Sequence, residues 1–229
     1  MINEIKEIKK RFSEQWEKGL PQLGLYRKKR LCKIIGPLVV GIELMDLRGG
    51  EEYKPCFVCY SLSKNTIEEC LDTPAVLFEF RDRKGFQLGI PYLKHDAMFP
   101  DALDCVKMQL PFKLDGDVFL TDVLNLVDKY AKMPPLSAAP TSYLQARLQE
   151  FRFELIIFAG SNEQMRDELD RIRKTSWDVP HFNLWKADVK TWLEGLEQKV
   201  NNRAGLLARI EKNKNDKSLE KLPRSEIIP

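Results

Sequence analysis

Hydrophobic residues recur at steps of three and four from the start of the chain, a spacing that predicts an amphipathic helix. Gly19 and Pro21 follow this stretch and predict where the helix ends. The apolar stripe of the helix consists of Ile2, Ile5, Ile8, Phe12 and Trp16. The chain therefore opens with one helix that buries a single face.

Three closely connected strands are predicted next, over residues 25–35, 38–48 and 52–62. The pair Gly49-Gly50 is a strong hairpin signal between the second and third strands. Both pleat faces of the second strand are apolar, which favours a central place in the sheet. Pro55 cannot donate a backbone hydrogen bond, so it favours an edge or a bulge in the third strand.

The segments that follow alternate between helix and strand. A short helix over 65–71 precedes strands over 75–80 and 86–90. Apolar residues that alternate with polar ones predict a half-buried strand over 106–114. A helix is then expected over 117–131.

The second half of the chain is expected to be mainly helical, with one strand over 151–158, where aromatic and β-branched residues dominate. Ser161 and Gln164 form a capping box for a helix. A long helical segment begins at Asn183 or Asp188 and should break near residue 201, where Asn and Gly residues weaken it.

These patterns predict an α+β protein with a largely antiparallel sheet in the N-terminal half, flanking helices, and a helix-rich C-terminal half. Residues 1–133 are expected to form the sheet domain, and the Pro-, Ala- and Ser-rich segment 134–140 is either a linker or a loop. Residues 141–213 would form a strand plus helices, and 214–229 a flexible basic tail.

The composition is that of a folded, cytoplasmic protein. The 229 residues are 43% hydrophobic and 31% charged, and a net charge of +3 is too small to require a polyanionic partner. The five cysteines are an odd number, which argues for a reducing compartment rather than a disulfide framework. The N-terminus lacks an apolar signal core, and no stretch approaches the roughly 20 apolar residues that span a bilayer. No membrane contact is expected.

The predicted order of elements resembles the αβββαβ core of restriction-endonuclease-like nucleases. That family carries an acid on its second strand and an acid-x-Lys pair on its third, where the carboxylates hold a divalent metal and the Lys orients the attacking water. The corresponding positions here hold Glu43 or Asp46 and the pair Glu52 and Lys54. Glu52 lies only two residues beyond the Gly-Gly turn, so a solvated hairpin is the alternative interpretation.

The densest basic run is Arg27, Lys28, Lys29 and Arg30. The first five elements also resemble double-stranded-RNA-binding domains in their order, which implies phosphate contacts. On a strand these side chains alternate between faces, so at most half of them can meet one phosphate backbone. The basic motif that opens the second helix of that family has no counterpart in the acidic segment 65–69. A solubilising strand edge is the alternative.

No metal or cofactor is predicted. Cys56 and Cys59 have a metal-like spacing, but no second close pair of Cys or His follows, and residues three apart on a strand point to opposite faces. The two histidines, His95 and His181, neighbour no nucleophile motif. The sequence also lacks a GxGxxG motif and a phosphate-binding loop.

An aromatic and aliphatic cluster marks the last quarter of the chain. Trp185 and Trp192 are seven residues apart, which predicts that they share one helix face. Together with Val189, Leu193 and Leu196 they give this segment more apolar surface than one small sheet can cover. A domain core and a protein interface are the two interpretations of the cluster.

The favoured function is that of a non-catalytic accessory or adaptor protein, which binds another protein or a second copy of itself through the C-terminal helices. An immunity-type inhibitor or a subunit of a bacterial defence assembly fits this profile. The alternative is a nucleic-acid-binding protein or a metal-dependent nuclease.

Overall fold

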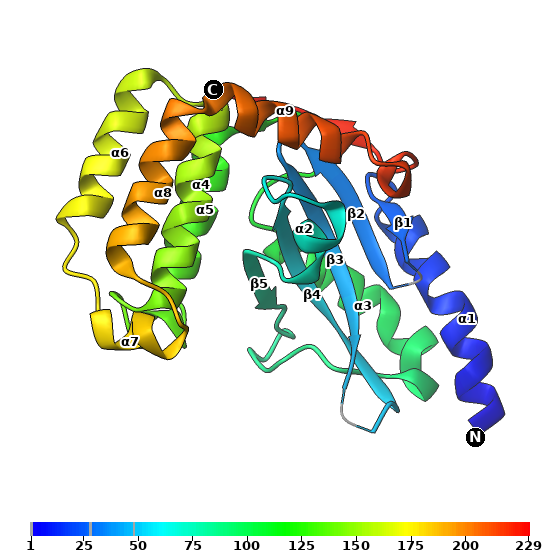
Figure 1. The fold of residues 1–229 in the computed structure, drawn as a ribbon. Coiled ribbons are helices and arrows are strands. Elements are labelled where there is room, and N and C mark those ends of the chain that lie inside the picture. Colours follow the sequence, from blue (N-terminus) through cyan, green and yellow to red (C-terminus); the bar gives the residue numbers. More distant parts are fainter. Residues whose placement is uncertain (1, 28, 48) are drawn as a thin grey trace.

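The computed structural model describes residues 2–27, 29–47 and 49–229 and confirms the α+β class (Figure 1). The first helix is α1 (Ile2–Gly19), as its apolar stripe predicts. An antiparallel meander follows, with the strands side by side in chain order: β1 (Gly24–Tyr26), β2 (Arg30–Ile35), β3 (Leu38–Asp46), β4 (Glu52–Ser61) and β5 (Val76–Glu79). The central place of β3 is confirmed. Gly41 allows its tight packing, because a side chain there would lie 1.9 Å from the Leu31 carbonyl oxygen.

Two hydrophobic clusters cover the two faces of this sheet. The first cluster packs α1, α3 (His95–Gln109) and α4 (Leu120–Ala131) against the face that carries Leu38, Val40 and Ile42. The second cluster packs α2 (Ile67–Asp72) and α9 (Arg203–Lys214) against the face that carries Val39 and Val58. Since side chains alternate along β3, its odd and even residues divide between the two clusters.

A layer of helices lies beside the sheet, as Figure 1 shows, formed by α4, α5 (Tyr143–Ala159), α6 (Asn162–Lys174) and α8 (Val189–Asn201), with the short α7 (Val179–Leu184) at one end. The capping box of Ser161 and Gln164 is confirmed at the start of α6. The expected break near residue 201 is also confirmed, because α8 ends there and Asn202 caps α9.

The strand expected over 151–158 is wrong, because these residues lie inside helix α5. Phe151 and Leu155 are buried in the first cluster, whereas Phe153, Ile156 and Ile157 are buried in the second. A helix that is buried on two sides has no single apolar stripe, so its sequence loses the 3.6-residue period. Without that period, the aromatic and β-branched residues of the segment favoured a strand. The packing around the segment, and not its local propensity, makes it a helix.

The strand expected over 106–114 is wrong as well. Helix α3 continues to Gln109, and its buried residues Ala102, Cys105 and Val106 have helical spacing. The alternating pattern over 106–114 covers the last turn of this helix and the loop that follows it, which is why it imitated a strand. Met108, the second apolar residue of the pattern, is 70% exposed.

Smaller corrections concern the edges of the sheet. The predicted strand over 25–35 is two strands, because Arg27 has a left-handed backbone with φ of 47°. Strand β4 is not an edge, since β3 lies on one side and both β5 and β6 (Ile90–Pro91) lie on the other. Pro55 lies between the residues of β4 that pair with β5 and those that pair with β6. On that side of β4 no strand among the described residues pairs with Pro55, so the missing N–H group removes no hydrogen bond between strands. Of the strand expected over 86–90, the structure has a bridge at Gln87 and the first residue of β6.

The segment 134–140 is a loop with one short 3-10 turn, η2 (Leu136–Ala138), between α4 and α5. The side-chain amide of Gln145 on α5 donates to the carbonyl oxygens of Ala131, at the end of α4, and Leu136. The first hydrophobic cluster includes residues from both sides of this loop. The division of the chain into domains stays a prediction.

The tail that was expected to be flexible is packed against the fold. Two short strands form there: β8 (Arg224–Ser225) pairs in parallel with β2, and β9 (Ile227–Ile228) with β7 (Val118–Phe119). Ile227 is buried in the first cluster, close to Gly36, where any side chain would approach Ile227 to within 3.0 Å. The polar composition of the tail concealed these few anchoring residues, since composition reports the average and not the contacts.

The two adjacent isoleucines of β9 provide a matched test of this anchoring. We expect Ile227→Ala to lower the free energy of unfolding by about 2–4 kcal/mol, because it leaves a cavity in the first cluster. Ile228→Ala, at an exposed position, should change it by less than about 1 kcal/mol. Urea unfolding of both variants measures the difference, and equal effects would show that the tail is not anchored as described.

Candidate functional site

Asp46 does not converge with Glu52 and Lys54 in the predicted nuclease site, whereas Glu43, the other acid considered for the second strand, lies on their face of the sheet. Asp46 lies directly opposite Tyr53 in the β3–β4 ladder, so it points to the face covered by α1. Glu52 and Lys54 flank Tyr53 in β4 and therefore point to the opposite face, where Lys54 forms an ion pair with Glu79. Two carboxylates on opposite faces of a strand pair cannot hold one metal ion.

Asp46 instead ties together three elements. It forms ion pairs with Lys29 and Lys9 and accepts a 2.6 Å hydrogen bond from the Tyr92 hydroxyl. Burial alone would raise the pKa of Asp46, but the bonds from Lys29 and Tyr92 outweigh it and lower that pKa. Asp46 is thus a structural carboxylate that joins the β3–β4 hairpin to α1 and to the segment after β6.

Two members of the basic run are paired within this sheet. Lys29 is paired with Asp46, and Arg30 with Glu43 at 3.0 Å on the next strand. Arg30 also lies over the ring of Tyr60. Arg27 is exposed beside the Tyr26 ring, and Lys28 lies outside the described residues. Lys29 and Arg30 are therefore already engaged by carboxylates of the protein, which makes them poor contacts for a phosphate backbone.

His95 is the centre of a buried hydrogen-bond chain. The indole N–H of Trp16 can only donate and gives a 2.9 Å bond to the Tyr53 hydroxyl oxygen. Tyr53 then donates to His95 Nδ1 at 2.8 Å, and His95 Nε2 donates to Gln15 Oε1 at 2.5 Å. This order assigns the neutral Nε2–H tautomer to His95. Burial lowers its pKa against the opposing effect of Asp96.

The other candidate groups are structural. Cys56 and Cys59 are buried on opposite faces of β4, as their spacing predicts, and burial raises the pKa of the Cys56 thiol to about 12. His181 accepts a 3.1 Å hydrogen bond at Nδ1 from the backbone N–H of Tyr143. Within 2–27, 29–47 and 49–229, no three His, Cys, Asp or Glu side chains gather as metal ligands would.

The five residues predicted to bind a partner differ in burial. Leu196 is buried in the second cluster, and the half-buried Trp192 and Leu193 pack against that cluster. Trp192 also donates its indole N–H to Glu150. Val189 is half-buried, and it lines a groove of about 590 Å³ together with Leu193 and Val179.

Trp185 does not share a helix face with Trp192, because it ends α7 before Asp188 caps α8. It is 54% exposed and its ring stacks on Tyr143, with the ring centres 5.7 Å apart. Leu184 beside it is 79% exposed. We call the exposed residues Val179, Leu184 and Trp185, together with the half-buried residues Val189 and Leu193, the α7–α8 surface.

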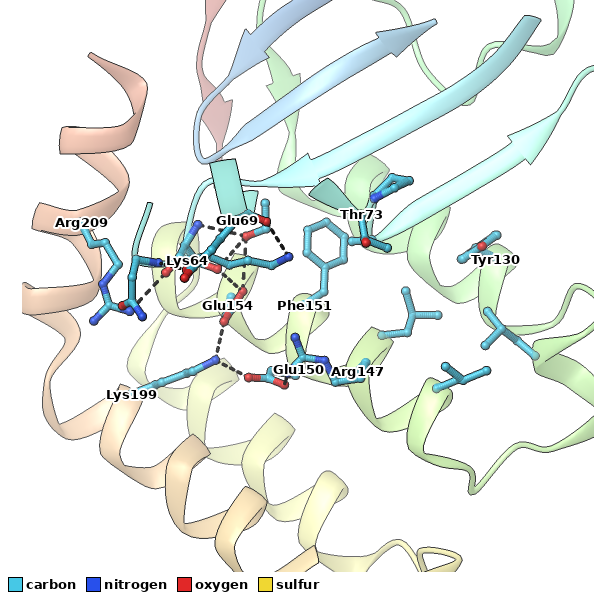
Figure 2. A pocket seen from close by; sticks show the side chains of 18 of the residues that line it. Lys64, Glu69, Thr73, Tyr130, Arg147, Glu150, Phe151, Glu154, Lys199 and Arg209 are labelled. Atoms are coloured by element: carbon cyan, nitrogen blue, oxygen red, sulfur yellow. Dashed lines mark hydrogen bonds and ion pairs between the residues drawn. The ribbon is translucent and has the colours of Figure 1, made fainter. Parts of the chain in front are cut away.

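A larger cleft, of about 600 Å³, lies between the helical layer and the end of the sheet that carries α2 (Figure 2). One part of its wall is apolar and includes Tyr130, Leu136, Leu144 and Phe151. The other part is charged and hydroxylated, with residues from the β4–α2 loop, α5, α8 and α9. Nothing in the sequence pointed to this cleft, because its residues come from segments spread between Ser61 and Arg209 and share no motif.

The charged wall is built around Lys199 of α8. Its ammonium group lies between Glu150 and Glu154, one turn apart on α5, and forms an ion pair with each (Figure 2). Glu150 also pairs with Arg147 at 2.6 Å, and Glu154 accepts a 2.6 Å bond from the Ser63 hydroxyl. Burial would raise the pKa of Glu150, but the charges of Lys199 and Arg147 outweigh it and lower that pKa. The network thus joins α8 and the β4–α2 loop to α5.

A second set of contacts closes the same end of the cleft. The side-chain amide of Asn213 on α9 donates to the carbonyl oxygens of Leu62 and Lys64 at 2.9 and 2.8 Å. Arg209, one turn earlier, donates to the carbonyl oxygen of Ser63 at 3.3 Å. Helix α9 therefore fixes the backbone that presents Lys64 to the cleft.

Comparison with known proteins adds no functional assignment. No protein-family model matches the chain, and neither curated proteins nor solved structures contain a significant match to it. Among the residues that the structure describes, no helix is both long and apolar enough to cross a bilayer.

Lys199 should be required for stability because it neutralises two partly buried carboxylates. We expect Lys199→Met to lower the free energy of unfolding by about 3 kcal/mol at neutral pH, since Glu150 and Glu154 then lose their shared partner. Because the pair holds the pKa of Glu150 below 4.5, its contribution is present above pH 4.5 and is lost as the pH falls through the folded-state value.

A matched control is Lys190→Met, whose side chain is 86% exposed on the same helix and should change stability by less than about 1 kcal/mol. Chemical denaturation at pH 7 and pH 4 measures both variants. Equal stability of the two at pH 7 would contradict the described role of Lys199.

His95 should make stability fall in mildly acidic solution. Its folded-state pKa lies below the ordinary value of 6.5, so the unfolded chain takes up a proton more readily, and stability decreases as the pH falls below about 6.5. We expect the wild type to lose more stability between pH 7 and pH 5 than His95→Gln. Thermal unfolding at both pH values measures this, and parallel pH profiles would show that His95 is not held neutral.

Proposed function

We propose that this protein is a non-catalytic accessory protein that binds a partner protein through the α7–α8 surface. The observation that carries the proposal is the pair Leu184 and Trp185, which is largely exposed at the end of the helical layer. Two adjacent large apolar side chains in such a position cost solubility unless another molecule covers them. Tryptophan is also among the residues that most often dominate the binding energy of an interface.

Trp185, the proposed anchor of the interface, is held in place before any partner binds. Trp185 stacks on Tyr143, and Tyr143 packs edge-to-face on the buried Phe182 at 5.3 Å. The imidazole of His181 accepts from the backbone of Tyr143 and fixes the start of α5 against α7. A side chain that is already ordered loses less conformational entropy on binding, which favours affinity.

The groove formed by residues of α6, α7 and α8 is lined by both apolar and charged side chains. Val179, Val189 and Leu193 supply its apolar residues. Its charged residues are Arg173, Asp188, Lys190, Glu194 and Glu197, and Arg173 pairs with Glu197. Protein interfaces combine apolar contacts with polar ones in this way. The partner is therefore expected to present an apolar segment accompanied by charges of both signs.

The test replaces the anchor without disturbing the core. A tagged wild-type protein is used to recover its partner from nuclease-treated lysate, and the partner is then purified and its affinity measured directly. We expect Leu184→Glu with Trp185→Glu to weaken binding by at least about 30-fold, the loss of one interface hot spot, while the variant stays folded. Met108→Glu, equally exposed on α3, is the control and should bind like the wild type.

Two results would count against the proposal. One is a purified partner that binds the double variant as tightly as the wild type. The other is a partner that is recovered only when nucleic acid is left intact, since that outcome favours the basic segments of the chain.

A further inference from the structure

We propose that the cleft of Figure 2 binds a small amphipathic carboxylate, a molecule with an apolar body and one anionic group. This inference goes beyond the proposed protein-binding function, because the cleft shares no residue with the α7–α8 surface. The cleft has the size expected of a site for a small organic ligand.

Among the described residues, some charged side chains of the cleft have partners of opposite charge and others do not. The lining carries more positive than negative side chains. The two carboxylates of its charged wall that lie on α5 are neutralised by Lys199 together with Arg147. Glu69 accepts the backbone N–H of Asn65 and so caps its own turn. Within the described part of the chain, Lys64 and Arg209 contact carbonyl oxygens, of Glu69 and Ser63, and form no ion pair with a carboxylate.

A carbonyl oxygen offers a partial charge, whereas an anion offers a full one. A bound carboxylate would therefore give Lys64 or Arg209 a charge-assisted hydrogen bond that the protein itself does not supply. The cleft is lined by four cations, Lys64, Arg147, Lys199 and Arg209, and by three carboxylates, Glu69, Glu150 and Glu154. Two of these carboxylates are held by Lys199 and Arg147. The excess of positive charge favours an anionic ligand over a cationic one.

The remaining wall selects an apolar body. Tyr130, Leu136, Leu144 and Phe151 lie along it, and Figure 2 shows Phe151 and Tyr130 on the side away from Lys199 and Arg209. Tyr130 is half-buried there and packs against the first cluster. A ligand that combines an alkyl or aromatic body with one carboxylate would cover this wall and reach the cations at the same time.

The test compares probes that share a body and differ in charge. Decanoate and 2-naphthoate are titrated into the isotope-labelled full chain below their aggregation concentrations, and amide NMR shifts report where they bind. Decanol and decyltrimethylammonium are the neutral and cationic counterparts of decanoate. We expect the two carboxylates to shift amides around Lys64 and Leu144, decanol to bind at least about tenfold more weakly, and the cation not to bind.

Variants separate the two halves of the cleft. Lys64→Gln with Arg209→Gln should weaken decanoate binding by at least about tenfold and leave decanol binding unchanged. Leu144→Ser should weaken both probes, because Leu144 belongs to the apolar wall and is exposed. Lys107→Gln, on α3 and away from the cleft, is the matched control.

The proposal is overturned if neither carboxylate shifts the cleft amides, if the cation binds as well as decanoate, or if the double variant binds decanoate normally. The variant with Leu184→Glu and Trp185→Glu should bind decanoate like the wild type. Because this variant changes only the α7–α8 surface, its decanoate binding shows whether the cleft works independently of the protein-binding surface.

Discussion

Burial of helix α5 on two sides is the constraint on which the rest of the structure depends. Phe151 and Leu155 complete the cluster under one face of the sheet, and Phe153, Ile156 and Ile157 complete the cluster on the other. Each such side chain contributes about 1.5–3 kcal/mol when it is fully buried, so this helix stabilises both clusters at once. Its remaining stripe carries Glu150 and Glu154, which hold α8 through Lys199. The cleft and the α7–α8 surface exist because α5 positions the elements around it.

The sequence predicted the elements whose signals lie within a short stretch of the chain. Helix α1 and helix α4 have a single apolar stripe, β3 is apolar on both sides, and the caps of α6 and α8 use side chains within four residues. These are local rules, and local rules can be recognised without the fold. The predictions failed where the surroundings decided the outcome. Helix α5 lost its period by double burial, and the tail is ordered through a few residues such as Ile227.

The candidate sites show the same division. A match of element order suggested Asp46, Glu52 and Lys54, but the pleat of β4 turns Lys54 away from Asp46. Strand register decides which face each side chain occupies, and a short motif does not fix that register. The aromatic cluster on α7 and α8 was recognised, although its members differ in burial: Leu196 belongs to the core, Trp192 and Leu193 are half-buried against it, and Trp185 is exposed. The cleft of Figure 2 joins distant segments and could be found only from the fold.

Polar groups in this protein mainly secure the packing of elements. The Trp16–Tyr53–His95 chain, Asp46, and the Lys199 pair each connect elements that lie far apart in sequence, and each side chain in them has its partners. Such networks are costly when one member is removed, which makes them unsuitable as sites where a ligand must displace existing contacts. The two binding proposals instead use groups outside these networks: Lys64, which contacts a carbonyl oxygen, and Trp185, which is largely exposed.

Native-state hydrogen exchange tests the role of α5 most directly. If α5 is the common wall of both clusters, the amides of Phe153–Ile157 open only with global unfolding and show the same free energy of exchange as the amides of Val39–Ile42 in β3. A markedly lower value for α5 than for β3 would contradict this, because it would mean that the helical layer opens while the sheet remains folded.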